Sequence, residues 1–204
     1  MTDPPTDRRA VEASGDRAAS AHAAGPVEPI RTARLSLVSM SPVFMRALRA
    51  RDFGTAEREI GASVPRDMAD DLAHFIAFRL AQLEVDPTIL EWLGRAMVLT
   101  DDAGTHRVIG SIGFHGPPDE LGRLEVGYRV EAEYRRQGYA MESVQALFDW
   151  ASERHAVTRF LASISPGNVA SRALTAKLGF REIGSQMDEI DGLELIFEVP
   201  WPPP

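Results

Sequence analysis

The chain has 204 residues, 44% of them hydrophobic, which is enough for one domain with a substantial core. It contains no cysteine, and this excludes a thiol nucleophile, a disulfide framework and a cysteine-ligated metal site. The formal net charge of −8 argues against general nucleic-acid binding, which depends on clustered basic residues that neutralise phosphates.

The N-terminal segment, residues 1–28, carries almost no bulky apolar side chains. Such a segment cannot bury enough surface to offset the entropy lost on ordering, so we expect a disordered tail over 1–28 and one domain over 29–204. No apolar run approaches the roughly 20 residues that span a bilayer, and the N-terminus has no apolar signal-peptide core. These features predict a cytoplasmic protein without membrane contact.

The first half of the domain is predicted to combine a strand, helices and a hairpin. The elements expected are a strand at 33–40, a helix at about 42–51, an amphipathic helix at 67–84, and hairpin strands at 96–100 and 108–114. Between the helices, Gly54, Gly61 and Pro65 indicate a loop or broken helix over 52–66. The aromatic residues Phe75, Phe78 and Trp92 are expected in the core.

Two strand–turn–helix units follow in the second half. The first has a strand at 124–130 and a helix whose apolar residues recur at helical spacing from Ala140 to Ala151. The second has a strand at 159–165, whose pattern suits burial on both faces, and a helix that begins at the N-cap Asn168. Gly179 is the expected left-handed residue after that helix, with Phe180 packing back on its last turn, and a hairpin of strands 184–187 and 193–199 closes the domain.

The turn of the first unit, residues 135–141, is suited to bind a phosphate group. The first N–H groups of a helix have no partner within the helix, and the helix dipole adds positive charge there. Gly138 has no Cβ, so the backbone can approach a bulky anion closely. Two arginines add positive charge that Glu131 and Glu133 partly offset, so we expect the backbone amides to matter most.

Together the two units resemble the GNAT superfamily of acyl-CoA-dependent N-acyltransferases. The first matches the family's Q/R-x-x-G-x-G/A element through Arg135, Gly138 and Ala140. The second matches the N-x-x-[A/S]…K-x-G-F element through Asn168, Ser171, Lys177, Gly179 and Phe180. The start of the domain, residues 33–41, is similar to that of the RimJ/RimL-like branch.

This resemblance implies an α/β GNAT fold: a mixed, mostly antiparallel sheet with a splayed parallel strand pair and flanking helices. It also implies acetyl-CoA as cosubstrate and no metal. The pantetheine arm would lie between strands 124–130 and 159–165, against the edge of Tyr128, Arg129 and Val130, and the pyrophosphate on the amides of 136–141. The remaining cofactor-binding residues implied are Arg135, Arg136, Gln137, Gly138, Tyr139, Ala140, Met141, Asn168 and Ser171.

Acetyl transfer to an amine needs a proton acceptor, because a lysine-like amine with a pKa of ~10.4 is protonated near neutral pH. Glu125 stands in an E-x-G-Y context found in the RimJ/RimL-like branch and is the candidate base; a cross-strand charge partner is the alternative. Many family members carry a tyrosine seven residues after the motif asparagine, where this chain has Thr175. Ser171 is therefore the candidate donor to the leaving thiolate; a bond to its own helix backbone is the alternative.

The function implied is direct transfer of an acetyl group, in a ternary complex, to a primary amine of a protein N-terminus or a small molecule. A catalytically idle acyl-CoA-binding regulatory domain is the alternative. Asp188, Glu189 and Asp191 favour a cationic acceptor, whose identity stays open. His74 and His115 could line an acceptor pocket but are read first as surface or structural residues. A homodimer through a sheet edge suits this fold.

Overall fold

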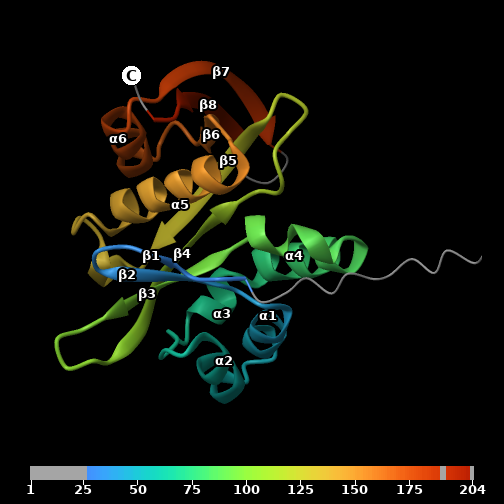
Figure 1. The fold of residues 1–204 in the computed structure, drawn as a ribbon, viewed down its shortest axis with the longest axis vertical. Coiled ribbons are helices and arrows are strands. Elements are labelled where there is room, and N and C mark those ends of the chain that lie inside the picture. The colour runs from blue at the N-terminus through green and yellow to red at the C-terminus, as the bar shows by residue number, and fades with distance from the viewer. Residues whose placement is uncertain (1–26, 189–191, 203–204) are drawn as a thin grey trace, which may run out of the picture.

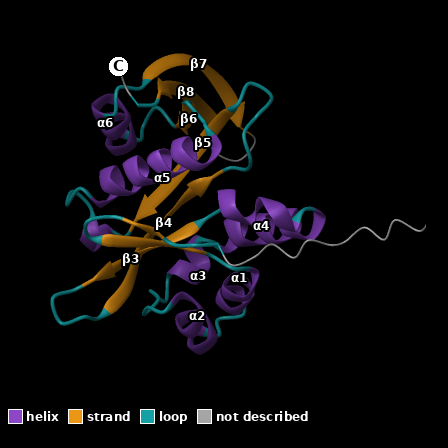
Figure 2. Cartoon of the chain, viewed as in Figure 1, coloured by secondary structure: helices purple, strands orange, loops and turns teal. Residues whose placement is uncertain are grey.

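The computed structural model describes residues 27–188 and 192–202. Within them, eight strands form one sheet in the order β1-β2-β3-β4-β5-β6-β8-β7, flanked by helices (Figure 1) (Figure 2). The β5–β6 pair is parallel and the other neighbouring pairs are antiparallel. The mixed, mostly antiparallel α/β sheet expected from the sequence is therefore confirmed.

The elements of the first half are β1 (Ile30–Arg31), β2 (Leu35–Ser39), α1 (Pro42–Arg49), α2 (Phe53–Ile60), α3 (Met68–Asp71), α4 (Ala73–Val85), the 3-10 helix η1 (Pro87–Trp92), β3 (Arg95–Thr100) and β4 (His106–Phe114). Those of the second half are β5 (Arg123–Val130), the 3-10 helix η2 (Ala132–Tyr134), α5 (Tyr139–His155), β6 (Arg159–Ile164), α6 (Val169–Lys177), β7 (Arg181–Asp188) and β8 (Gly192–Pro200). No helix among the described residues combines the length and apolar character needed to cross a membrane.

The prediction of a loop or broken helix over 52–66 is wrong for its first part, which forms the regular helix α2. Asp52 caps this helix by accepting a hydrogen bond from the Thr55 N–H at 3.1 Å. Gly61 ends it in the left-handed conformation, with φ of 70°. The glycine therefore terminates the helix instead of breaking it, and the buried Ala56 and Ile60 hold α2 against the core.

The single helix predicted over 67–84 is two helices, α3 and α4, which meet at the buried residue Leu72. The inward face of α4 includes Arg79, which is buried and donates to the His115 carbonyl at 2.7 Å. Phe78 lies on the other side of α4 and is 59% exposed, so its predicted place in the core is wrong. Trp92 does lie in the core.

The core has two parts, one on each face of the first half of the sheet. Alternate residues of β3 show this division, since Met97 belongs to one cluster and Ala96 and Val98 to the other. Met97 packs with the cluster that includes the buried face of α5, whereas Ala96 and Val98 pack with α1, α2 and α4. In Figure 1, α5 and α6 lie near β5–β8, and α1, α2 and α3 gather beside β1–β3.

The second half follows the predicted order with one correction. Phe160, Ala162 and Ile164 of β6 are buried, but Leu161 and Ser163 are only half-buried, so β6 is buried on one face and not on both. Gly179 is left-handed, with φ of 83°, and Phe180 is buried, as predicted. Glu189, Asp191 and most of the predicted tail lie outside the described residues.

Candidate functional site

The parallel strands β5 and β6 separate after a short paired stretch. They pair at Arg123–Arg159, Leu124–Phe160 and Glu125–Leu161. Beyond Glu125, β5 continues beside β4, and β6 continues beside β8. A gap therefore opens in the sheet after Glu125, between two strands that are each supported on their other side.

The backbone of β5 presents alternate residues to this gap. The Glu125 carbonyl accepts from the His115 N–H, and the Glu131 N–H donates to the Ile109 carbonyl, both at 2.9 Å and both on the β4 side. Neighbouring residues in such a ladder point the opposite way, so Val126, Tyr128 and Val130 direct their N–H and C=O groups to the gap. Of the three residues predicted to form the binding edge, Arg129 instead directs its backbone to β4.

One carbonyl at this edge already has a partner. Arg135 donates from Nε to the Val130 carbonyl at 2.8 Å. This contact ties the turn before α5 to the end of β5, while Gln137 ties it to Glu133 through a 3.0 Å bond from its side-chain amide to the carbonyl. The peptide groups of Val126 and Tyr128 remain as the open edge of β5.

The turn before α5 directs the start of that helix outward. Arg136 and Gly138 both have positive φ, 60° and 87°, and both are exposed. The first helical hydrogen bond at this end runs from the Glu142 N–H to the Gly138 carbonyl at 3.0 Å. The N–H groups of Tyr139, Ala140 and Met141 precede it, so the helix itself provides no acceptor for them. This end of α5 is suited to an anion.

A contact that sequence reasoning missed braces the same turn. Arg34, from the loop between β1 and β2, donates to the Gln137 carbonyl at 3.0 Å and pairs with Glu142 of α5 at 2.7 Å. A cavity of about 560 Å³ adjoins this contact and includes Arg34 and Tyr139 in its wall. Arg34 and Glu142 are 108 positions apart, so no local pattern could have linked them.

Glu125 lies where the gap begins, and its side chain is 26% exposed. His115 Nδ1 is 3.5 Å from its Oε1. Burial acts to raise the pKa of Glu125, but hydrogen bonds from His115 and Ser163, together with the His115 charge, lower the pKa below its ordinary value. Glu125 is therefore a carboxylate at neutral pH, with His115 from the β4–β5 connection and Ser163 of β6 as its neighbours.

Ser171, the predicted donor to the leaving thiolate, lies beside Tyr128. Burial raises the pKa of Tyr128, whereas the nearby Ser171 side chain acts in the opposite direction. Within the described residues the buried Tyr128 hydroxyl has no hydrogen-bond partner, so it is available to a ligand. Asn168 positions this serine, because its side chain accepts from the Ser171 N–H at 3.1 Å and thereby caps α6. Tyr128 thus adds a buried hydroxyl to the site, which the sequence indicated only as a backbone contact.

Thr175, at the position where many family members have a tyrosine, faces away from this chemistry. It is 2% exposed, and its hydroxyl donates to the Arg172 carbonyl of its own helix at 2.9 Å. Lys177 of the same helix is exposed, as is His74 on α4. Of the two histidines considered for the acceptor pocket, His74 and His115, His115 is the one that contacts a predicted catalytic residue, Glu125.

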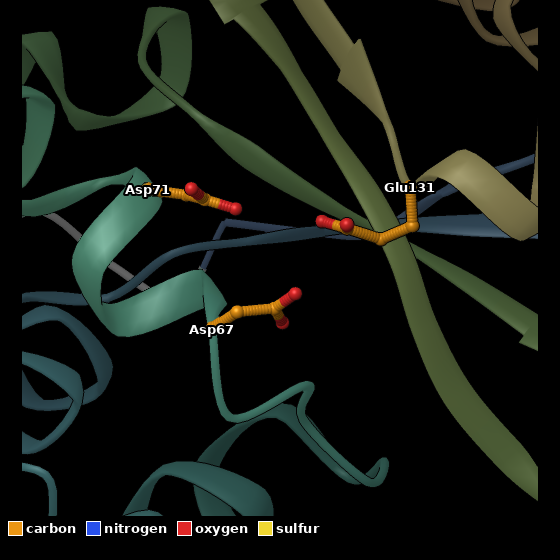
Figure 3. A group of neighbouring side chains, drawn as sticks. All are labelled: Asp67, Asp71 and Glu131. Carbon is orange, nitrogen blue, oxygen red and sulfur yellow. The ribbon is translucent and has the colours of Figure 1, made fainter.

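Three carboxylates come together near the far end of β5 (Figure 3). Asp67 precedes the short helix α3, Asp71 is its last residue and Glu131 follows β5; their ligand oxygens lie within 4.8 Å of one another. Arg129 pairs with Asp71 and lies 4.0 Å from Glu131. Burial and the charges of Asp67 and Asp71 raise the pKa of Glu131 against the opposing charge of Arg129. The cluster is an ion-pair network with an acidic surplus.

Comparisons with known proteins agree with this geometry. The family model described as "Acetyltransferase (GNAT) domain" matches residues 43–181, more than half of the chain. The uncharacterized N-acetyltransferase YjdG of Bacillus subtilis (strain 168) is 39% identical over 75 residues, which cover 37% of this chain and 45% of that protein. The uncharacterized N-acetyltransferase p20 of Bacillus licheniformis is 34% identical over 84 residues, which cover 41% of this chain and 47% of that protein. The chain thus matches less than half the length of these relatives.

Solved structures share the fold at low identity. RimL, a ribosomal L7/L12 α-N-protein acetyltransferase, has a TM-score of 0.58 at 15% identity, covering 85% of this chain and 94% of that chain. The microcin C7 self-immunity acetyltransferase MccE, in complex with acetyl-CoA and AMP, has a TM-score of 0.56 at 15% identity, covering 82% and 93%. The ribosomal-protein-S5-alanine acetyltransferase of Vibrio fischeri has a TM-score of 0.55 at 16% identity, covering 85% of this chain and 96% of that chain. On the strength of the family model, this chain belongs to the GNAT acetyltransferase family.

Proposed function

We propose that this chain is an N-acetyltransferase that moves an acetyl group from acetyl-CoA to a primary amine, directly within a ternary complex. The observation that carries the proposal is the gap between β5 and β6, which opens beyond Glu125. Glu125 contacts His115 where the gap begins, and Ser171 of α6 lies beside Tyr128 of β5. The start of α5 stands beside the same strand end. A nucleophile, a thioester and a proton acceptor need such a shared site.

The residues present fit acetyl-CoA. Its pyrophosphate would be held by the N–H groups of Tyr139, Ala140 and Met141, which the helix leaves unbonded. The amides of its pantetheine arm would pair with the peptide groups of Val126 and Tyr128, as an added strand pairs with a sheet edge. Acetyl-CoA supplies the activated acetyl group as a thioester.

Glu125 would take the proton of the acceptor amine. As the amine nitrogen forms its bond to the acetyl carbon, the nitrogen loses a proton, and a carboxylate at the start of the gap is suited to receive it directly or through water. The lowered pKa of Glu125 keeps this carboxylate ionised through the neutral range. His115, 3.5 Å from Oε1, would orient the carboxylate.

Ser171 would assist the departure of coenzyme A. As the carbon–sulfur bond breaks, the sulfur takes up negative charge, and the Ser171 hydroxyl on α6 would stabilise this charge as a hydrogen-bond donor. Tyr128 lies next to Ser171, and burial keeps its own hydroxyl protonated by raising its pKa. The pair would therefore present a donor to the sulfur.

The second candidate function is a catalytically idle acyl-CoA-binding regulatory domain. The observation that favours it is Thr175, whose hydroxyl is buried and bonded within its own helix instead of facing the gap. Such a domain would bind acetyl-CoA without acetylating any amine. Turnover of any amine with acetyl-CoA, read as release of free thiol, separates the two candidates.

The acceptor we propose is cationic. Asp67, Asp71 and Glu131 carry an acidic surplus over Arg129 at the end of β5 away from Glu125, and the field of this surplus favours the approach of an amine that arrives protonated. Protein N-terminal peptides and small polyamines are both members of this class. Thiol release measured across both kinds of amine, with neutral and acidic acceptors as comparison, tests this part: a preference for acidic acceptors would contradict it.

A further inference from the structure

Arg34 makes an unusual set of contacts at the start of α5. Its Nε donates to Glu142 Oε2 at 2.7 Å, and its Nη1 donates to the Gln137 carbonyl at 3.0 Å. Its guanidinium also lies over the Tyr139 ring, 4.3 Å from the centroid. A Cβ at Gly138 would be 3.3 Å from Arg34 Nη2. One side chain thus contacts both the turn that would receive the pyrophosphate and the first turn of α5.

The carboxylate of Glu142 requires a compensating positive charge at the position of Arg34. It is in the first turn of α5, next to the unbonded N–H groups, so its negative charge would oppose a second anion there. Burial acts to raise the pKa of Glu142, but hydrogen bonds from Thr32 and Arg34 lower the pKa, and the group is ionised at neutral pH. The Glu142 side chain is only 17% exposed, so solvent screens it weakly, whereas the Arg34 side chain is 44% exposed.

We propose that Arg34 is a positioning residue for the pyrophosphate of acetyl-CoA: it compensates the charge of Glu142 and holds the Gln137 carbonyl away from the binding face. This inference rests on the proposed function, because it assigns a role toward the same ligand. Arg34 lies more than 100 residues before the turn in sequence and belongs to neither of the two cofactor motifs.

Loss of the Arg34 side chain should expose the Glu142 charge without displacing it. Glu142 Oε1 also accepts from the Thr32 hydroxyl at 2.5 Å and from the Arg34 backbone N–H at 2.8 Å. Both of these bonds survive in Arg34→Ala. The variant therefore places an uncompensated carboxylate beside the phosphate site, while Glu142 keeps its hydrogen bonds from the Thr32 hydroxyl and the backbone N–H of residue 34.

The test compares the wild type with Arg34→Ala, Glu142→Gln and the double variant, using calorimetric titration with acetyl-CoA. Arg31→Ala is the matched control, because Arg31 is exposed in the wall of the same cavity and its loss changes the net charge equally. We expect Arg34→Ala to raise the Kd about tenfold, Arg31→Ala and Glu142→Gln to change it less than about threefold, and the double variant to recover most of the loss. The defect should also shrink at high salt.

A phosphate-free thioester separates positioning from a general structural effect. Arg34→Ala should use S-acetylpantetheine as the wild type does, because that compound has no pyrophosphate for the Glu142 carboxylate to repel. Unchanged acetyl-CoA affinity in Arg34→Ala would overturn the inference. So would a double variant that binds acetyl-CoA as weakly as Arg34→Ala does, or an Arg34→Ala defect with S-acetylpantetheine as large as that with acetyl-CoA. A wild-type protein that does not bind acetyl-CoA would remove the proposed function and this inference with it.

Discussion

Glu125 and Ser171 illustrate how single residues in this chain are set for chemistry by their neighbours. His115 and Ser163 hold Glu125 as a carboxylate, and Asn168 fixes the first turn of the helix that carries Ser171. The charge of His115 adds to this effect. We therefore propose Glu125 as the proton acceptor, at the start of the gap, and Ser171 on α6 as the hydroxyl donor.

Replacing Glu125 with glutamine should lower turnover at least tenfold and most strongly at acidic pH. There the acceptor amine is most fully protonated, while the lowered pKa keeps the wild-type carboxylate available. The defect should shrink as the pH rises toward the pKa of the amine. Initial rates of thiol release between pH 6 and pH 9, with the exposed Glu84→Gln as control, measure this; equal rates in both variants would remove Glu125 from the mechanism.

The same lowered pKa has a consequence for stability. A carboxyl whose pKa is lower in the folded state stabilises the fold above its unfolded pKa, near 4.5, and that contribution is lost as the pH falls through the folded value. Assays of Glu125→Gln above about pH 6 therefore avoid this range, and differences in rate there report on chemistry.

Ser171→Ala should reduce turnover roughly tenfold to a hundredfold while leaving the Kd for acetyl-CoA nearly unchanged, because a donor to developing charge acts mainly in the transition state. Tyr128→Phe should produce a smaller defect in the same direction. Thr175→Val is the matched control, since the Thr175 hydroxyl is bonded to its own helix. Full turnover in Ser171→Ala, or a defect as large in Thr175→Val, would contradict the role of Ser171.

At the scale of elements, the start of α5 is the main structure for anion binding. Gly138 combines a left-handed backbone with proximity to the unbonded N–H groups. Gly138→Asp should weaken acetyl-CoA binding on the order of a hundredfold, through bulk and like charge. Gly138→Asn has nearly the same size and also tolerates the left-handed region, so it isolates the charge and should lose less. Titration calorimetry on both variants decides; wild-type affinity in Gly138→Asp would rule out this phosphate site.

The sequence was most informative where the structure is determined locally. The N-cap Asn168 and the left-handed Gly179 delimit α6 through bonds within a few residues, so both could be read from the chain. The helix α2 was missed because glycine was taken as a breaker, although Gly61 ends the helix and Asp52 caps it. The break at Leu72 depends on burial against the rest of the protein, which periodicity does not encode.

In the candidate site, too, local features could be predicted from the sequence and contacts between distant segments could not. The positions of Glu125, Gly138 and Ser171 follow from motif spacing within each strand–turn–helix unit. Contacts between distant segments do not: Arg34 reaches Glu142 across 108 positions, and His115 of the β4–β5 connection reaches Glu125 only after the strands pair. Such contacts require the register of the sheet, which a single sequence does not provide.

The whole molecule is a sheet whose two parts are joined at three β5–β6 residue pairs before the strands separate. A ligand that fills the gap and bonds to the start of α5 would link both parts. At 100 times its Kd, acetyl-CoA should stabilise the fold by about 2.7 kcal/mol, which for a chain of this size raises the Tm by roughly 5–10 °C. Thermal unfolding with acetyl-CoA, and with S-acetyl-N-acetylcysteamine as a control lacking the nucleotide, checks this; equal shifts would argue against binding at the helix start.

The most direct test of the central claim is calorimetric titration of the purified protein with acetyl-CoA, followed in the same preparation by thiol release with a panel of amines. We expect saturable binding of one acetyl-CoA per chain and turnover with at least one cationic primary amine. Binding without turnover on any amine would contradict the enzyme proposal in favour of an acyl-CoA-binding domain. Absence of acetyl-CoA binding would contradict the account as a whole.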